Sequence, residues 1–472
     1  MHRSAGRAVI IGAGFSGTLL AVNLLRQGFS VGLVERSHAF GRGIAYSTSH
    51  PDLLLNVRAS NMSAFPDDAT HFSRWLGARD GGAPQGFASR AEYGDYLAAL
   101  LEEAERSAVG RLATYRSAAV DVDIAADGTQ VMLDDGTLIG ADVVILAVGN
   151  LSPHDPPGID PTMMPPGSYV KDPWAAGAGE GLSDGQAVLV MGTGLSMVDT
   201  VLMLDARGFR GRIVALSRRG LLPLAHAAEP GPQHAPLAER PRDTGAALLR
   251  SVRRRAAEIG WRAAVDELRP HTQAMWIAAS RVEQARFLRH VRPWWDIHRH
   301  RLAPRIADRI AALRGAGRLE VVAGRLTGVS AHPQGGISIE WRERGSGRTG
   351  GGRFGRVVNC TGPRGDIVQA KEPLLRLLLA AGHIRPDPHG LGIDVNAAGE
   401  AIDARGRANP RLFVLGPMTR GAFWEIVAVP DIRQQSAAVA HLLSKRHHES
   451  LQQHVRPDWP VEGVAAPAGP EW

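Results

Sequence analysis

Short apolar runs alternate with amphipathic stretches along this chain, and two of the runs lead into a glycine-rich turn. The run Ala8–Ile11 precedes Gly12-Ala13-Gly14, and the run Ala187–Met191 precedes Gly192-Thr193-Gly194. After each turn, apolar residues recur at helical spacing, and another apolar run follows. The pattern therefore predicts two β–α–β units, over residues 7–36 and 185–220.

The rest of the chain is predicted to mix both kinds of element. Strictly alternating residues predict a small antiparallel sheet, and fully apolar runs predict buried parallel strands. The antiparallel strands are expected at 115–123, 130–134 and 137–140, and the buried strands at 143–148 and 411–416. Further strands are expected at 319–323, 326–331, 336–342 and 354–360, and helices at 68–77, 90–105, 431–445 and throughout an arginine-rich stretch from about 240 to 315.

A proline-rich stretch, Ser152–Pro166, separates the two β–α–β units and is typical of a crossover between domains. The last buried strand lies after the second unit, so we expect the first unit to be interrupted by the second. The expected division is residues 1–165 for the first part of the first domain, 166–350 for the second domain with its helical segment, and 351–472 for the completed first domain and a C-terminal helix.

The first turn has the spacing of a dinucleotide-binding fingerprint. Gly12 permits a tight turn, Gly14 lets the backbone approach a pyrophosphate, and Gly17 lets helix and strand pack closely. Glu35 ends the next strand and is placed to accept hydrogen bonds from ribose hydroxyls. We therefore predict that Gly12, Gly14, Phe15, Ser16, Gly17 and Glu35 contact FAD.

The second turn is a weaker match, because Met197 replaces the third glycine. Its second strand ends in Ser217-Arg218-Arg219 rather than in an acid. Arginine offers a planar fork to a 2′-phosphate, which an acid would repel, so this cluster favours NADPH over NADH. The alternative is two solvated arginines in an arginine-rich protein. The predicted NADPH contacts are Gly192, Gly194, Leu195, Ser196, Ser217, Arg218 and Arg219.

Two apolar strands, ending at Gly149 and at Thr361-Gly362, run into a small residue and glycine, which either brings backbone close to a nucleotide, marks a crossover between domains or is ordinary strand punctuation. A third strand, ending at Gly416, is expected beside the flavin ribitol. These three strand ends supply the predicted cofactor contacts Gly149, Thr361, Gly362 and Gly416. Many flavoproteins have Asp after the last of these glycines, whereas this chain has Pro417, so any contact there would come from backbone. Further predicted cofactor contacts are Arg36, Gly43, Asn56, Met62 and Val120.

Composition narrows the class of protein. The chain has 472 residues, 44% hydrophobic and 21% charged, which is ordinary globular composition. Its formal charge of +7 comes with no basic stripe on a recognition fold, so we expect no nucleic-acid partner. No apolar run approaches the ~18 residues of a membrane span, and the N-terminus enters a strand directly, so a cytoplasmic protein is expected. The single cysteine, Cys360, excludes a dithiol redox centre.

The motifs resemble those of a bacterial FAD/NAD(P)-binding protein family, from about residue 8 to 440. The matching stretches read GAGFSGTLLAVNLL, GRGIAYST, LLNVRASNMSAFPDDATHF, MGTGLSMVD, ALSRRGLLP, RFLRHVRPWWDIHRHRLAP, NCTGP and FWEIVAVPDIRQQ. One branch of that family oxidises the amine of L-aspartate to nitrosuccinate, and ornithine and lysine N-hydroxylases are more distantly similar. The resemblance implies an α/β flavoprotein with two dinucleotide-binding domains, glutathione-reductase-like Rossmann folds and a helical insertion. It also implies FAD, NADPH, O2 and a small amino-acid substrate.

An acidic amino acid would need paired cations for its carboxylates. The segment Arg286–Arg301 mixes Arg, His and Trp densely, and Arg433 opens the last predicted helix. The alternative for the segment is a basic surface helix with buried tryptophans, and a metal site at His298 and His300 lacks accompanying ligands. Arg58, which stands where the family usually has Pro, is either neutral or a cation near the flavin. The predicted catalytic residues are Asn56, Arg58, Arg292, His300, Arg301 and Arg433.

The leading hypothesis is an NADPH- and O2-dependent flavin monooxygenase that oxidises the amine of a small amino acid, with L-aspartate as the first candidate. One rival is a flavin reductase or oxidase that passes electrons to O2, a quinone or a protein partner. Another is a flavin-binding redox sensor without turnover. A homo-oligomer is possible in each case.

Overall fold

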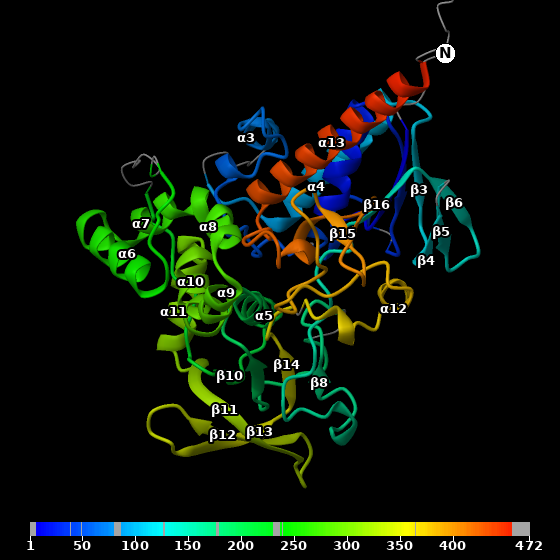
Figure 1. Cartoon of the computed structure of the whole chain (residues 1–472). Coiled ribbons are helices and arrows are strands. Elements are labelled where there is room, and N and C mark those ends of the chain that lie inside the picture. The colour runs from blue at the N-terminus through cyan, green and yellow to red at the C-terminus, as the bar shows by residue number, and fades with distance from the viewer. Residues whose placement is uncertain are drawn as a thin grey trace, which may run out of the picture.

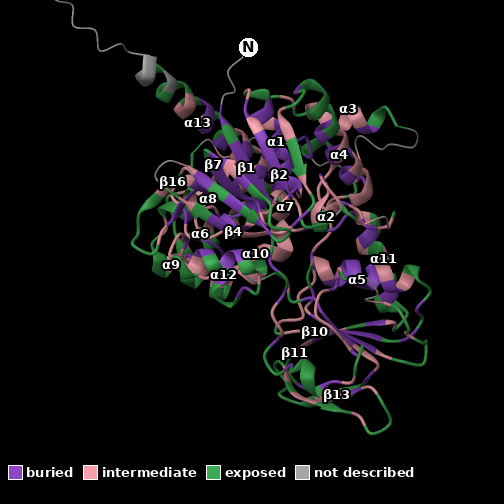
Figure 2. Cartoon of the chain, turned by 90° about the vertical axis from the view of Figure 1, so that its right-hand side faces the viewer, coloured by how far each residue is buried: buried purple, intermediate pink, exposed green. Residues whose placement is uncertain are grey.

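The structure is a computed structural model that describes residues 6–37, 39–48, 50–79, 86–125, 128–175, 179–229, 237, 239–363 and 365–455. The described residues form two units, each built on its own largely parallel sheet, and a layer of helices beside them (Figure 1). The central parallel strands of both sheets are mostly buried, as Figure 2 shows by colour. The predicted α/β fold with two nucleotide-binding units is confirmed.

The first unit has a six-stranded sheet in the order β15-β16-β7-β1-β2-β3, parallel except for the pair β15–β16. Its strands come from both ends of the chain, because the second unit is inserted between β7 and β15. The strands are β1 (Arg7–Ile11), β2 (Ser30–Val34), β3 (Leu112–Tyr115), β7 (Val143–Leu146), β15 (Glu400–Ile402) and β16 (Ala408–Val414).

Strand β1 shows how the two faces of this sheet are covered. Ala8 and Ile10 pack on one face with residues of α1 (Phe15–Arg26), α4 (Arg90–Ser107) and α13 (Val429–Val455). Val9 and Ile11 pack on the opposite face with residues of a small antiparallel sheet and of α12 (Pro373–Ala380). That small sheet consists of β4 (Ala119–Ile124), β5 (Thr129–Leu133) and β6 (Leu138–Ala141). The predicted small antiparallel sheet and the helix predicted at 431–445 are therefore both present, and that helix, α13, is longer than predicted.

The second unit has a seven-stranded sheet in the order β13-β12-β11-β10-β9-β14-β8. Strands β8 to β11 and β14 run parallel, and β11, β12 and β13 form an antiparallel ribbon. The strands are β8 (Tyr169–Val170), β9 (Val188–Met191), β10 (Ile213–Ser217), β11 (Leu319–Ala331), β12 (Ile337–Glu343), β13 (Thr349–Phe354) and β14 (Arg356–Asn359). Helices α5 (Leu195–Ala206) and α11 (Pro304–Gly315) pack against this sheet.

The domain limit predicted at residue 350 is too early. It falls inside β13, and β14 then pairs with β9 from Arg356 to Asn359, so the second unit continues to about residue 360. The two strands expected at 319–323 and 326–331 are one strand, β11, with an irregular register between Leu326 and Gly328.

The arginine-rich stretch forms a layer of short helices that contacts both units. Its elements are α6 (Gly245–Ile259), α7 (Trp261–Leu268), η3 (Arg269–His271), α8 (Thr272–Ala278), α9 (Arg281–Arg286), the π-helical turn η4 (Phe287–Val291) and α10 (Arg292–Arg299). Trp276 donates to the carbonyl of Gly421 in the first unit, at 2.8 Å. Arg219 of the second unit stacks on Trp294, 6.0 Å from the ring centre.

Shorter elements complete the first unit. They are α2 (Gly43–Tyr46), η1 (Ala59–Asn61), α3 (His71–Gly77), η5 (Ile367–Gln369) and η6 (Gly416–Thr419). The turn η2 (Pro161–Met163) belongs with the second unit, because Ile159 and Met164 beside it pack in the core of that unit.

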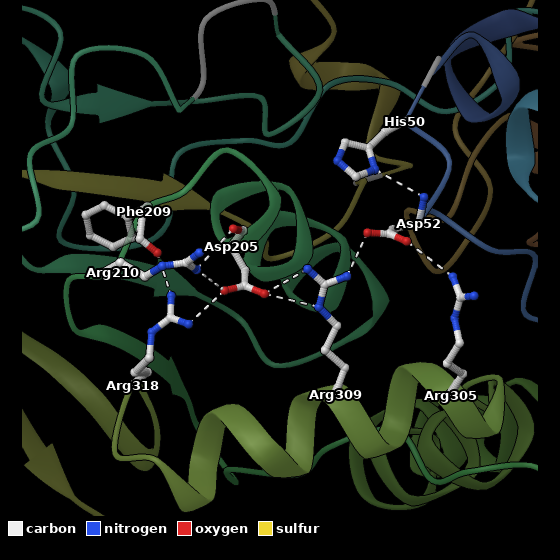
Figure 3. A network of polar contacts seen from close by, with 8 residues as sticks. All are labelled: His50, Asp52, Asp205, Phe209, Arg210, Arg305, Arg309 and Arg318. Atoms are coloured by element: carbon white, nitrogen blue, oxygen red, sulfur yellow. Dashed lines mark hydrogen bonds and ion pairs between the residues drawn. The ribbon is translucent and has the colours of Figure 1, made fainter.

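Ion pairs join the two units directly. Asp52 of the first unit contacts Arg305 and Arg309 on α11, and Arg309 also contacts Asp205 on α5 (Figure 3). Arg318 and Arg210 contact the same Asp205. The carboxylates therefore lie between arginines from several elements, which fixes the two units relative to each other.

Candidate active site

The first glycine turn has room for backbone only. Gly12 has φ of +105°, and a Cβ on it would overlap the carbonyl of Ala147 at the end of β7. A Cβ on Gly17 would overlap the carbonyl of Gly12. Helix α1 begins after Gly14 with no side chain capping its first N–H groups. A pyrophosphate fits such a helix start, because the free N–H groups and the helix dipole both favour an anion.

Glu35 lies against this turn. Its carboxylate accepts the N–H of Ala13 and the N–H of Ser37, both at 2.9 Å. The acid is therefore fixed beside the start of α1, where the predicted ribose contact requires it. Arg36 follows at an exposed position.

The second turn repeats the first with one chemical difference. The N–H of Gly12 bonds the carbonyl of Val34, and the N–H of Gly192 bonds that of Leu216, so Ser217 occupies the position of Glu35. Its hydroxyl pairs with the Thr193 hydroxyl at 2.9 Å. Gly192 has φ of +112° and abuts the carbonyl of Cys360. Helix α5 likewise starts at Leu195, and no side chain caps it. The backbone of Gly194, Leu195 and Ser196 therefore forms a helix start without a side-chain cap.

The three glycine strand ends all have left-handed backbone, with φ of +69° at Gly149, +87° at Gly362 and +76° at Gly416. A Cβ on Gly416 would overlap the hydroxyl of Ser16 on α1. Gly43 approaches as closely from α2, since its Cβ would lie 2.8 Å from the Cα of Gly14. The structure thus gathers Gly14, Ser16, Gly43 and Gly416 around the start of α1. Thr361 instead donates its hydroxyl to Asn359 at 2.7 Å, next to Gly362.

Asn56 and Arg58 lie where the first unit meets the second. The carbonyl of Asn56 accepts a bond from His226 at 3.0 Å, and Arg58 donates to the carbonyls of Ala227 and Ala228 at 3.0 and 3.2 Å. The Arg58 guanidinium also stacks on Phe87. These contacts give Arg58 a role in joining the units. Two other predicted cofactor contacts lie in different places. Met62, four residues after Arg58, is buried, and Val120 is half-buried on β4.

The helical layer and the loop after β16 together enclose a group of charges. Glu425, 1% exposed, accepts the indole N–H of Trp295 at 2.8 Å and pairs with Arg299 at 2.9 Å. Arg420 lies over the ring of Trp424, 4.5 Å from its centre, and Arg292 approaches the same ring at 5.9 Å. Asp296 pairs with Arg292 at 3.4 Å. We call these residues, with Arg269 and Asp431, the cationic cluster.

Burial shifts the pKa values of residues in the cationic cluster and of the adjoining His300. It lowers the pKa of His300, which lies within 4.0 Å of Asp296, and together with neighbouring Arg292 it lowers the pKa of Arg420 to about 10. Burial alone would raise the pKa of Glu425, but nearby His300 and Arg299 and the bond from Trp295 outweigh it, so that pKa is lowered. Glu425 is also the one non-glycine residue with positive φ (+71°) among the described residues. Such strain is typical of functional sites.

Several polar atoms of the cationic cluster are buried and make no hydrogen bond with the residues that the structure describes. They are Nε of Arg269, Nε of Arg420, Nε1 of Trp424, Oε2 of Glu425, Oδ1 of Asp296, and Nε and one terminal nitrogen of Arg299. The Arg299–Glu425 contact is thus an ion pair without hydrogen-bond geometry. Buried donors without acceptors are costly, so this concentration of them indicates a place for a polar ligand.

The two remaining arginine predictions have different outcomes. Arg301 is 4% exposed, contacts both carboxylate oxygens of Asp266 at 3.0 Å and also donates to the carbonyls of His298 and Arg262. Its donors therefore hold α10 to α7, which argues against the predicted substrate contact. Arg433 donates to the carbonyl of Ser63 at 3.1 Å, while its Nε is buried without a partner among the described residues. Arg433 and Arg292 thus keep donors for a ligand.

The sequence interpretation missed Arg420, Glu425 and Arg269, and it included Arg299 only as part of the segment Arg286–Arg301. Glu425 lies in the apolar stretch Phe423–Val429, where a charged residue is unexpected, and that was the available signal. Its partners are about 130 residues away and no local pattern indicates them.

This geometry defines a class of protein: a two-domain α/β flavoprotein fold of the FAD/NAD(P)-binding type. Residues 9–151 match a family model described as FAD-NAD(P)-binding. No curated protein has a significant sequence match to the chain. Within the described helices, none is long and apolar enough to cross a membrane.

Solved structures with this fold include two hydroxylases and a monooxygenase. The reduced form of ornithine hydroxylase from Pseudomonas aeruginosa has 14% identity and a TM-score of 0.65, covering 94% of this chain and 99% of that one. The cadaverine monooxygenase of Erwinia amylovora bound to FAD has 14% identity and a TM-score of 0.65, covering 98% and 99%. The ornithine N-hydroxylase of Kutzneria with reduced FAD, NADP+ and L-ornithine has 14% identity and a TM-score of 0.62, covering 93% and 99%. At this identity the likeness is one of fold.

Proposed function

We propose that this protein is an FAD-dependent monooxygenase that uses NADPH and O2 to oxidise the amine of a small acidic amino acid, with L-aspartate as the first candidate. The glycine turns and uncapped helix starts fit the pyrophosphates of two dinucleotides, FAD at α1 and NADPH at α5. When bound, FAD supplies the redox chemistry that passes electrons from NADPH to O2.

The observation that carries the choice of substrate is the charge of the cationic cluster. Its four arginines (Arg269, Arg292, Arg299 and Arg420) face three acids (Asp296, Glu425 and Asp431), which leaves one positive charge in excess. An acidic amino acid has a net charge of −1 and would balance it, whereas ornithine and lysine have a net charge of +1. The buried donors of Arg420 and Arg299 would gain carboxylate acceptors.

Aromatic side chains pack against one side of this site. Trp276 stacks on Trp424 with ring centres 5.0 Å apart, and Phe287 meets Trp424 edge-on at 5.2 Å. These rings form an apolar wall beside the cluster. A charged hydrogen bond to a carboxylate is stronger beside such a wall than in water.

The test is a screen of amino acids scored by oxidised product, not by NADPH consumption alone. We expect L-aspartate or L-glutamate to give product in proportion to NADPH consumed. In Arg420→Gln the KM for that amino acid should rise at least tenfold, a loss of about 1.4 kcal/mol. Arg314→Gln, on the exposed side of α11, is the matched control. Product from L-ornithine but not from acidic amino acids would refute the choice of substrate, and peroxide without product for every amino acid would refute the monooxygenase.

A further inference from the structure

A large pocket, of about 840 Å³, lies where the second unit meets the helical layer, and Pro293 in its wall adjoins Arg292 of the cationic cluster. Its walls come from the end of β10, the β11–β12 ribbon, the π-helical turn η4 and the start of α10. Six arginines line it: Arg218, Arg219, Arg289, Arg325, Arg342 and Arg344. We call it the arginine pocket.

The arginines of this pocket have no acidic partner among the residues that the structure describes. Several other arginines of the second unit are paired with an acid, as Arg309 and Arg318 are with Asp205 (Figure 3). The side chain of none of the six lining arginines makes an ion pair or donates a hydrogen bond within the described parts of the chain. The lining acid, Glu343, pairs with Arg348 at 3.4 Å instead. The pocket therefore has a strong positive charge that its own residues do not neutralise.

Two of the arginines are held side by side by the sheet itself. Arg325 on β11 lies directly opposite Arg342 on β12 in the antiparallel register. Like charges directly opposite each other destabilise a strand pair. A bound anion with two negative charges would remove this repulsion, so the pair favours a phosphate monoester over a singly charged ligand.

The pocket adjoins the second nucleotide turn. Ser217 pairs with Ala323 in the parallel register, and a Cβ on Gly220 would lie 3.0 Å from the Cβ of Ala323. Arg325 is two residues further along β11, so it lies beside the Ser217–Gly220 loop. Since Ser217 occupies the position that Glu35 has in the first unit, no acid stands at the end of β10 to repel a phosphate.

An aromatic side chain completes the site. Trp294 of α10 is 47% exposed, and Arg219 lies 6.0 Å from its ring centre. Trp294 adjoins Pro293, which lines the pocket. An exposed indole next to a phosphate site is suited to stacking on a purine base.

We propose that the arginine pocket binds the 2′-phosphorylated adenosine of the reductant, and that Arg325 and Arg342, from outside the fingerprint, determine its preference for the phosphorylated dinucleotide together with Arg218 and Arg219. Trp294 of the helical layer stacks on the adenine. This inference rests on the proposed use of NADPH, and it adds residues that no part of the glycine fingerprint indicates.

The experiment measures binding by calorimetry to the oxidised, FAD-loaded protein without any amino acid. The probes are adenosine 2′,5′-bisphosphate and adenosine 5′-phosphate. In Arg325→Gln/Arg342→Gln we expect the Kd of the bisphosphate to rise at least tenfold and that of the 5′-phosphate to stay within twofold. In Trp294→Ala both Kd values should rise by a similar factor. The control Arg254→Gln/Arg314→Gln removes the same charge from exposed positions on α6 and α11 and should bind like the unmodified protein.

The outcomes separate this inference from the proposed function. Unchanged bisphosphate binding in Arg325→Gln/Arg342→Gln would overturn the inference, whether or not an amino acid is oxidised. An equal loss in the control variant would also overturn it, because overall charge would then be the cause. Bisphosphate binding that depends on Arg325 and Arg342 in a protein that oxidises no amine would uphold the inference and refute the monooxygenase.

Discussion

Arg90 and Asp199 meet at 2.6 Å across the junction of the two units, with side chains only 16% and 9% exposed. Arg90 is the first residue of α4 in the first unit, and Asp199 lies on α5, directly behind the second glycine turn. Burial raises the pKa of Asp199 more than Arg90 lowers it. Removing the two charges from water therefore costs more free energy than their attraction returns. The pair thus serves to join the units rather than to add stability.

Breaking this pair should be far more harmful than its small net contribution suggests. Asp199→Ala leaves the Arg90 charge buried without a partner, and we expect a loss of about 3 kcal/mol in the free energy of unfolding, measured in urea. Glu103→Ala removes a partner from the exposed Arg106–Glu103 pair and is the control, with no measurable change expected. Equal effects of the two substitutions would contradict the role of the buried pair.

Flavin retention should depend on Gly416. A Cβ there meets the Ser16 hydroxyl, and the φ of +76° strains any other residue. We expect Gly416→Ala to be purified with less than half of the normal flavin content, measured by absorbance relative to protein. Gly208→Ala has a similar φ of +87° with open space around its Cβ, so it tests strain without the clash and should keep its flavin.

Acid should weaken the folded state through His300. Burial lowers its pKa below the ordinary 6.5, so below pH 6.5 the unfolded chain takes up a proton that the folded chain resists. The contribution is at most about 1.4 kcal/mol per pH unit. The apparent Tm should fall between pH 7 and 5, and less steeply in His300→Gln. His441→Gln, at an exposed position of α13, should leave the slope unchanged.

Coupling of NADPH consumption to product should depend on Arg433. Its Nε is buried without a partner among the described residues, and we propose that it holds a substrate carboxylate. Arg433→Ala should lower the ratio of product to NADPH consumed at least threefold, with peroxide making up the difference. An unchanged ratio at saturating substrate would remove Arg433 from the substrate site.

Glu425 should be required for the arrangement of the cationic cluster. Glu425→Gln retains an acceptor for Trp295 but removes the charge that faces Arg299 and Arg420. We expect a loss of stability and a substrate KM that changes more than kcat, because the arginines would be rearranged. Glu425→Asp, which keeps the charge on a shorter side chain, should recover part of the KM. If both variants behave like the unmodified protein, the cluster does not depend on this acid.

Much of the fold follows from local pattern. The parallel strands are continuous apolar runs. The spacing of the glycines in the sequence predicted the two turns, where a Cβ on Gly12 or Gly192 would overlap a neighbouring carbonyl. Strand β13 escaped prediction because its sequence, TGGGRF, has no apolar alternation. It forms by backbone pairing with β12, which no residue pattern of its own indicates.

The site was less predictable because it is made by contacts distant in sequence. Arg292 and Arg301 lie nine residues apart and look equivalent, yet Asp266 takes up the donors of Arg301 while Arg292 remains beside Trp424. The Arg325–Arg342 pair depends on the register of the ribbon. Residue types at given spacings predicted the cofactor turns, whereas the identity of the substrate contacts depends on packing between units.

The burial of Cys360 affects how well the protein resists oxidation. The sulfhydryl of this sole cysteine lies buried against Thr200 at 3.2 Å, and burial raises its pKa to about 12. At neutral pH the sulfur is therefore held as the thiol, whereas hydrogen peroxide attacks the thiolate. A catalyst that leaks peroxide whenever turnover is uncoupled would therefore spare its own sulfur, and its working life should be set by methionine oxidation or flavin loss.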